Sequence, residues 1–514
     1  MPAYRLTDTR NIPDESRFKS HGSRPFVPIL LIAAIGVLLL IGTSSQAANI
    51  QTLVAACSLA LAGLLVAGIN SRQVPVLTSA ISLRLGVLMP LSLAVVGLLG
   101  TSAWLFFEPK SLLARVPEDF LLIAAVLLGA GLIFFSLGYR LAPQIFVRLA
   151  QGLDASVTRG SSRGLSPGGV LLLLMVSLTG HAMRLATNSF GYATNDPLGA
   201  SINFLPWLGG VLSALDLCAV ALACWLVAVK RTRSSLALAF LAFSLCLLLA
   251  LLQSGRAPVL ELVIAALAGA ALGAGQNITK KTALLGVLVL VCAFIVMTEI
   301  STSYRTVINS GSERLGPIAA ASQFLNDPDR FDSSAEQSTL ESALFRLGRV
   351  GDVAIIMSRT PSQVPYADTT SLLTAPVLGV IPRQIWRGKP IIDTSGEMTR
   401  FYYQAPNLAS GTAMTPVGDL WRRGGLPIVA LGMPFLGVLI RLVDDRVAQE
   451  HASPIGLFLP LLLLFPFASW ETDFVGLVAG FPLKLVQYVL ACRILAIVSL
   501  GNAHAFKSAN GGGG

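Results

Sequence analysis

Charged residues are scarce in this sequence of 514 residues, because Asp, Glu, Lys and Arg together make up only 12% of it. Hydrophobic residues make up 54%, and the mean hydropathy is +0.71. A typical soluble domain has about 25% charged residues. The scarcity of charge therefore excludes a soluble globular protein and predicts an all-α integral membrane protein with many spans.

Cysteine and histidine are scarce as well, and neither forms a metal-ligand pattern. The six cysteines all fall in apolar segments without CxxC or Cys/His spacing, so we interpret them as small packing residues. The apolar runs begin only after a polar tail at 1–25, and no cleavable signal peptide is evident. No internal repeat indicates the inverted halves of a transporter.

Long apolar runs dominate what is present. A helix that crosses the hydrocarbon layer needs roughly 20 mainly apolar residues, and about twelve segments meet this requirement. They lie at 26–43, 50–70, 86–107, 119–139, 168–187, 204–229, 234–252, 257–275, 282–300, 425–441, 455–470 and 474–497. The chain thus divides into a tail (1–25), nine spans (26–300), a long polar segment (301–424), three spans (425–498) and a tail (499–514).

Lys and Arg are concentrated in the N-terminal tail and in alternate breaks between the spans. The short breaks of the other set hold only Lys110, Arg115 and Arg256. Because Lys and Arg are retained on the cytoplasmic side during insertion, both termini are expected in the cytoplasm and the 301–424 segment outside. This orientation signal accounts for much of the net charge of +10, so nucleic acid is not predicted as a partner.

The long polar segment becomes basic from Glu341 onward. Arg binds phosphate oxygens through a planar fork and keeps its charge, so an Arg-rich site beside a membrane predicts a lipid-linked phosphate or diphosphate as ligand. The segment contains no HxH, HExxH or Asp-rich cation motif, and no metal or other cofactor is predicted. Apolar spacing predicts a helix over 341–359 that ends before Pro361, and a re-entrant or interfacial element over 371–381.

Three arginines lie near the outer ends of predicted spans and are expected to face this segment. They are Arg184, Arg256 and Arg305. Each one alone could instead be a side chain that snorkels to the lipid headgroups.

A group-transfer reaction at such a site would need a proton acceptor, and the long segment contains no histidine. Asp419 is the first candidate, because it stands before the span at 425–441 beside Arg422 and Arg423. A structural ion pair is the alternative interpretation of this carboxylate. The other candidates for the proton acceptor are Glu341, Asp352, Glu397, Glu471 and Asp473.

Four short motifs stand in order along the second half of the chain. They are Ser254-Gly255-Arg256, Tyr304-Arg305, the stretch Ile381-Pro382-Arg383…Trp386…Lys389-Pro390, and Thr415-Pro416-Val417-Gly418-Asp419-Leu420…Gly424-Gly425. Together they resemble the Wzy-type polymerases of O-antigen and exopolysaccharide repeat units. Each motif is weak by itself, so the resemblance depends on their order, spacing and sidedness.

The resemblance implies a GT-C-type glycosyltransferase of the bacterial inner membrane. Its substrates would be undecaprenyl-diphosphate-linked oligosaccharides, which serve as donor and acceptor, and undecaprenyl diphosphate would be released at the periplasmic face. Membrane lipid and a chain-length regulator protein are the implied partners. The resemblance assigns substrate binding to Arg256, Arg305, Arg346, Arg383 and Lys389. Arg184 is added to them from its position at the end of a span, and Asp419 stays the candidate catalytic residue from its position beside two cations.

Three other functions stay open on the sequence. An O-antigen ligase would carry a histidine in its long outer loop, whereas the histidines here are His21, His181, His451 and His504. A flippase or transporter of the same lipid-linked sugars would distribute charges along the bundle interior, where Glu261 and Lys484 are the main ionisable residues. A scaffold protein of polysaccharide export would not require the clustered arginines.

Overall fold

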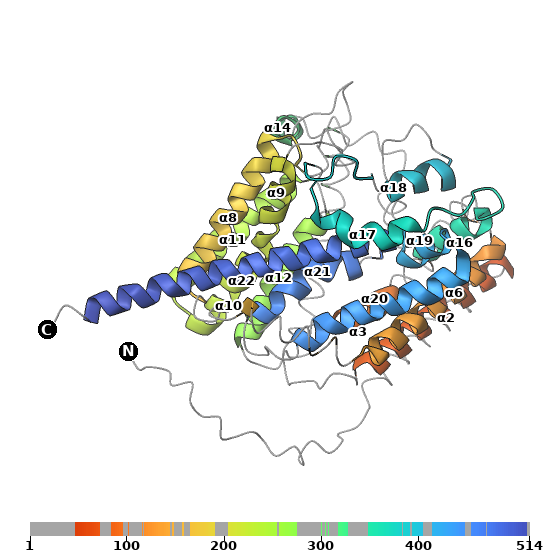
Figure 1. Ribbon diagram of the computed structural model, residues 1–514, viewed down its shortest axis with the longest axis horizontal. Helices are drawn as coiled ribbons and strands as arrows, with labels where there is room; N and C mark the ends of the chain where they lie inside the picture. The colour runs from red at the N-terminus through yellow and green to blue at the C-terminus, as the bar shows by residue number, and fades with distance from the viewer. Residues whose placement is uncertain are drawn as a thin grey trace, which may run out of the picture.

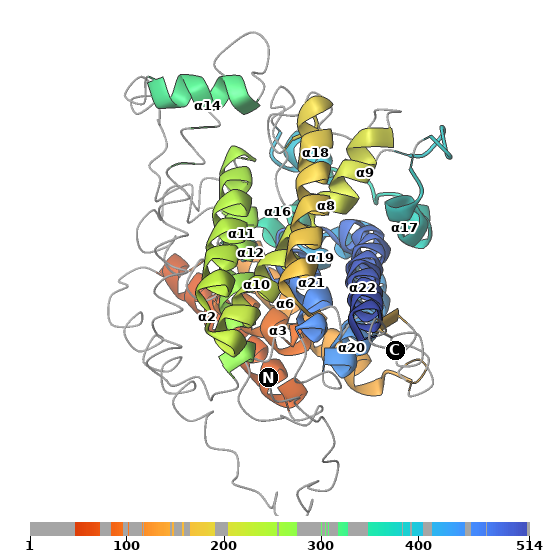
Figure 2. The same cartoon turned by 90° about the vertical axis from the view of Figure 1, so that its left-hand side faces the viewer.

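The computed structural model shows an all-α chain (Figure 1). The residues it describes are 47–71, 84–95, 101, 116, 118–143, 146, 148, 157–158, 165–190, 204–253, 256–274, 300, 304, 307, 317–326, 348–382, 384–390, 393–404, 414–447, 454–468 and 470–510. Helices from both halves of the sequence pack into one bundle, in which α20 from the second half lies along α6 from the first (Figures 1 and 2).

Seven helical segments of the described part are long and apolar enough to cross a membrane. They are α6 (Glu118–Leu141), α8 (Pro167–Ala186), α9 (Phe204–Ser213) together with α10 (Leu215–Lys230), α11 (Arg233–Leu252), α12 (Arg256–Ala274), α20 (Gly425–Val447) and α22 (Phe474–Asn510). Each coincides with a span predicted from the sequence. The predicted spans at 26–43 and 282–300 lie outside the described residues, so the total of twelve and the sidedness stay predictions.

Three further helices match predicted spans in position. They are α2 (Ala47–Ser71), α3 (Leu85–Val95) and α21 (Ile455–Ala468). The last two predicted spans are separated by a hinge, since 470–473 are not helical and Trp470 has a φ of 57°. Two boundaries differ: the predicted span at 204–229 is broken between α9 and α10, and α22 continues as a helix through Asn510, into the predicted tail.

Glycines allow the helices to approach closely. Gly138 of α6 lies against the backbone carbonyl of Pro434 on α20, and Gly269 of α12 lies against that of Ala221 on α10. Lipid tails are as apolar as Leu side chains, so membrane helices associate largely through such close backbone packing.

A buried carboxylate connects three helices of the bundle. Asp444 on α20 accepts hydrogen bonds from the backbone N–H groups of Leu85 (2.9 Å) and Gly86 (2.8 Å) and from the hydroxyl of Tyr139 (2.9 Å). The first N–H groups of a helix have no partner within it. Asp444 therefore caps α3 from another helix.

The long polar segment contains short helices. They are α14 (Pro317–Asn326), α16 (Arg349–Arg359), α17 (Thr370–Val380), α18 (Thr394–Glu397), the π-helix η5 (Met398–Tyr402) and α19 (Pro416–Trp421). The predicted helix that ends before Pro361 is confirmed over Arg349–Arg359, whereas 341–347 lie outside the described residues. The predicted apolar element at 371–381 is α17, which runs beside α22 (Figure 1).

The contact between α17 and α22 depends on a glycine, because Gly379 faces the carbonyl of Ala479 with no room for a Cβ atom. Gly379→Ala is expected to displace α17 and to lower the stability by about 1–3 kcal/mol. Thermal unfolding of the detergent-purified protein measures this. Gly388→Ala is the matched control, because its nearest neighbour is 4.0 Å away. Equal unfolding midpoints for the two variants would contradict the prediction.

Candidate functional site

Helix α19 places Asp419 where the polar segment meets the bundle. The hydroxyl of Thr415 accepts a hydrogen bond from the N–H of Gly418 (3.0 Å), and Pro416 occupies the first helical position. Both residues are typical of helix starts, so the Thr415-Pro416 pair fixes where α19 begins. The chain leaves this helix through Gly425, whose φ of +68° suits glycine, and continues as α20.

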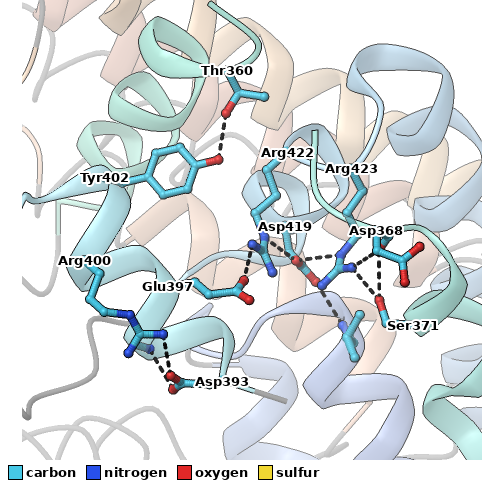
Figure 3. A network of polar contacts seen from close by, with 12 residues as sticks. Thr360, Asp368, Ser371, Asp393, Glu397, Arg400, Tyr402, Asp419, Arg422 and Arg423 are labelled. Atoms are coloured by element: carbon cyan, nitrogen blue, oxygen red, sulfur yellow. Dashed lines mark hydrogen bonds and ion pairs between the residues drawn. The ribbon is translucent and has the colours of Figure 1, made fainter. Parts of the chain in front are cut away.

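Asp419 is the centre of a network of charged side chains (Figure 3). It is fully buried. Its Oδ1 accepts hydrogen bonds from Nε of Arg422 (2.8 Å) and Nε of Arg423 (2.9 Å), and its Oδ2 accepts one from the backbone N–H of Val475 (3.1 Å). Residues three and four positions apart share a helix face, which explains the double pairing. Asp419 thus joins α19 to the first turn of α22.

The same two arginines reach outward into the polar segment. Arg422 pairs through Nη1 with Oε2 of Glu397 (2.5 Å), and Arg423 donates through Nη1 to the carbonyl of Asp368 and to the hydroxyl of Ser371 (both 2.5 Å). Glu397 ends α18 and Ser371 lies in the first turn of α17 (Figure 3). The network therefore holds two segments of the polar region against α19, namely α18 and the start of α17.

A second network surrounds Arg349 at the start of α16. This arginine is 2% exposed and binds Oδ2 of Asp352 through Nη1 (2.8 Å) and Oε1 of Glu471 through Nη2 (2.5 Å). The hydroxyl of Tyr403 donates to Oδ1 of Asp352 (2.6 Å). Burial raises the pKa of Asp352 in spite of the Arg349 charge. Burial alone would lower the pKa of Arg349, but the charges of Asp352 and Glu471 outweigh it and raise that pKa.

The two networks meet at the hinge that precedes α22. The hinge contributes Glu471 to the network of Arg349, and its Asp473 lies near Asp419 of the other network. The pKa of Asp473 is raised to about 6 by burial and by the neighbouring charge of Asp419, although its Oδ1 accepts a hydrogen bond from Gly476 (2.7 Å). Asp473 is only partly buried, as is Glu471. The site therefore presents accessible carboxylates, one of which takes up a proton near neutral pH.

Carboxylates outnumber cations in the two networks together. Arg349, Arg422 and Arg423 face five acidic side chains, namely Asp352, Glu397, Asp419, Glu471 and Asp473. These arginines are thus already engaged by acidic groups of the protein. In the described ranges, no group of three or more His, Cys, Asp or Glu side chains is placed to hold a metal ion.

Of the six residues predicted to bind substrate, the structure describes the side chains of Arg184 and Lys389. Arg184 lies on α8, where it donates to the carbonyl of Ser189 and to the hydroxyl of Ser213. Lys389 donates to the carbonyl of Ile381 (3.1 Å). Arg256 opens α12, but its side chain lies outside the described residues. The other three predicted residues, Arg305, Arg346 and Arg383, also lie outside the described residues.

Several residues of the site were not singled out from the sequence. Arg349 and Tyr403 are the clearest examples. The spacing of Arg349 and Asp352 on the predicted helix, three residues apart with opposite charge, was a usable signal for their pairing. No sequence signal joins Arg349 to Glu471, which is 122 positions away.

The fold and the site define the class of protein: an all-α chain whose described part contains seven long apolar helices that could cross a membrane, with a charged site where a polar segment meets them. Residues 198–450 match a family model described as "Domain of unknown function (DUF8712)". That region includes the α9–α10 break, the long polar segment, α19 with its charged network, and α20. No curated protein and no solved structure is similar enough to the chain to be matched to it.

Proposed function

We propose that this chain is a membrane glycosyltransferase that polymerises undecaprenyl-diphosphate-linked oligosaccharide repeat units at the periplasmic face of the bacterial inner membrane. One observation carries the proposal. A partly buried carboxylate with a raised pKa, Asp473, lies next to an arginine-bound carboxylate, Asp419, where a polar segment meets membrane-type helices. The motif resemblance to Wzy-type polymerases adds the substrate class.

The reaction requires the acceptor sugar to lose a proton. A hydroxyl oxygen of the incoming repeat unit attacks the anomeric carbon of the donor glycan, the bond from that carbon to the diphosphate oxygen breaks, and undecaprenyl diphosphate leaves with the bonding electron pair. The hydroxyl proton passes to a carboxylate. A proton acceptor is most effective when its pKa is near the working pH, which favours Asp473 over the other acidic residues.

Asp419 was the candidate proton acceptor from the sequence, and its surroundings suit a different task. Its oxygens accept three hydrogen bonds inside the protein, and no part of its side chain is exposed. We assign it as a positioning residue that orients Arg422 and Arg423 and fixes the first turn of α22. Its negative charge also keeps the pKa of Asp473 high.

Binding of the diphosphate is a separate task within the proposal. The arginines of the two networks are held by carboxylates, so they are poor candidates for an added phosphate group. The predicted cations Arg256, Arg305, Arg346 and Arg383 therefore keep this assignment, with Arg184 and Lys389 as additional candidates.

Purified protein in lipid nanodiscs, supplied with a lipid-linked repeat unit, is expected to form a glycan ladder and to release undecaprenyl diphosphate. Asp473→Asn should lower kcat by about 10²–10⁴-fold with little change in KM, because the proton acceptor is lost. Arg256→Ala and Arg305→Ala should suppress the ladder by weakening diphosphate binding. Asp393→Asn is the matched control, because Asp393 is a carboxylate of the same segment that caps α18. A near-native rate in folded Asp473→Asn protein would exclude Asp473 as the base.

Transport of the same lipid-linked sugars is a second candidate function, and one observation favours it. Asp216, Glu261 and Lys484 interact electrostatically inside the helix bundle, and charges in the bundle interior are typical of transporters. Transfer of the lipid-linked repeat unit across proteoliposomes without any glycan ladder would support transport over polymerisation.

A further inference from the structure

The broken helix α9–α10 is surrounded by polar side chains of neighbouring helices. The two halves form one apolar segment, Phe204–Lys230, that is long enough to cross a membrane. The break at Ala214 lies inside this segment, between the last residue of α9 and the first residue of α10. Irregular backbone inside a membrane span is tolerated only where it is buried in protein or lines a polar cavity.

Side chains from two other helices hold the break. On α8, the hydroxyl of Ser177 donates to the carbonyl of Ser213 (3.0 Å), and Nη1 of Arg184 donates to the Ser213 hydroxyl (3.4 Å). On α22, Nε2 of Gln487 donates to the carbonyl of Gly210 (3.2 Å). The carbonyl groups of Gly210 and Ser213 near the end of α9 therefore accept hydrogen bonds from side chains of other helices.

A histidine and a carboxylate meet across this break. Nε2 of His181 on α8 lies 3.3 Å from Oδ2 of Asp216, which is in the first turn of α10. His181 is 2% exposed, and its Nδ1 has no hydrogen-bond partner in the described part of the chain. When Nε2–H of a neutral imidazole donates to a carboxylate, the free lone pair is on Nδ1. The unpartnered atom of His181 is thus the one that can accept a proton.

The positive and negative charges around this pair are equal in number when the imidazole is neutral. Asp216 interacts electrostatically with Arg184 on α8 and with Glu261 on α12, and Glu261 interacts with Lys484 on α22. Two cations thus face two anions. The neighbouring helices α9 and α21 contain no charged residue, and α11 contains only Arg233 at its start. Histidine is the side chain that exchanges a proton most readily near neutral pH.

A second unpartnered polar atom lies at the same break. Gln487 is 2% exposed, and its Oε1 has no partner among the described residues, although its Nε2 binds Gly210. Buried polar atoms of this kind are commonly satisfied by internal water. Water at the break would pass a proton between bulk solvent and the imidazole.

We propose that His181 and Asp216 form a proton-binding pair inside the helix bundle, with the proton bound at Nδ1 of His181. The carboxylate of Asp216 stabilises the imidazolium that forms, and the proton comes from bulk solvent through internal water, which takes up one proton for each that it passes on. The pair makes the charge of the α9–α10 break depend on pH. This inference does not rest on the proposed glycosyltransferase activity, because proton binding is measured without any sugar substrate.

The sequence makes a direct test practical, because the chain has only four histidines. Replacing His21, His451 and His504 by Gln leaves His181 as the single histidine. Protein labelled with carbon-13 at histidine Cε1 and reconstituted in nanodiscs then gives one signal to follow by NMR. We expect this signal to move reversibly between pH ~8 and ~5 as the imidazole is protonated.

Asp216→Asn should lower the midpoint of this titration, because an opposite charge beside the imidazole is removed. Glu261→Gln should lower it less, and Lys484→Gln should raise it; these variants leave the His181 contact intact and serve if Asp216→Asn does not fold. Asp119→Asn, an exposed carboxylate at the start of α6, is the matched control and should leave the midpoint unchanged. A signal that does not move between pH ~5 and ~9 would overturn the proposal, as would an unchanged midpoint in Asp216→Asn.

Discussion

Asp419→Ala is expected to lower the free energy of unfolding by about 3–5 kcal/mol, the usual cost of removing one partner of a buried ion pair. The substitution removes the carboxylate that Arg422 and Arg423 share, while both arginines stay buried. It also removes the acceptor of the Val475 N–H. The contacts of both arginines with other segments of the polar region are then expected to weaken as well. Thermal unfolding of the detergent-purified protein measures the effect.

The matched control for Asp419→Ala is Arg400→Ala. Arg400 also forms an ion pair in this region, with Asp393 at 2.7 Å, but its side chain is 42% exposed. Exposed pairs contribute about 0–1 kcal/mol, so this variant should unfold close to the native temperature. Similar midpoints for the two variants would show that Asp419 does not anchor the network.

Asp419→Asn separates anchoring from proton transfer. The amide keeps the shape of the side chain and one acceptor oxygen but removes the charge that binds two arginines. The geometry predicts that its activity loss accompanies lower stability, rather than occurring in an otherwise native protein. Near-native turnover in correctly inserted Asp419→Asn protein would remove Asp419 as the base, and it would also show that turnover does not need the carboxylate to orient Arg422 and Arg423.

The helices were predictable where one physical requirement dominates. About 20 apolar residues in a row can do little except cross a membrane as a helix, so the positions of α8, α11 and α12 follow from hydropathy alone. The break at Ala214 was not predictable in this way, because hydropathy treats Phe204–Lys230 as one apolar segment in spite of Ser213 and Asp216 beside the break. The break is held by side chains of α8 and α22, which are distant in sequence.

The candidate site was predictable only through its local pairs. Asp419 with Arg422 and Arg423 follows from helical spacing within one short motif. The contacts of Arg349 with Glu471 and of Asp419 with Val475 join segments 122 and 56 positions apart, and only the packing of α16, α19 and α22 creates them. A count of charges along the segment indicated a basic region, whereas the described networks are rich in carboxylates.

Asp473→Asn is expected to stabilise the protein at neutral pH while it removes activity. Burial and the charge of Asp419 raise the pKa of Asp473 from 3.8 to about 6. Between these values the folded chain binds more protons than the unfolded chain, so stability falls as the pH rises through this window. Above pH ~6 the ionised carboxylate costs up to about 3 kcal/mol, which solvent access lowers to about 1–2 kcal/mol. The amide of Asn avoids this cost and still accepts the hydrogen bond from Gly476.

Thermal unfolding of native and Asp473→Asn protein at pH ~4 and ~7.5 tests this sign. The variant should unfold at a higher temperature than the native protein at the upper pH, and the difference should shrink at the lower pH, where native Asp473 is protonated. Asp393→Asn should show no such convergence, because Asp393 pairs with the exposed Arg400. A less stable variant at pH ~7.5 would mean that attraction to Arg422 and Arg423 exceeds the repulsion from Asp419. Asp473 would then be another ionic anchor of the network and would lose its claim as proton acceptor.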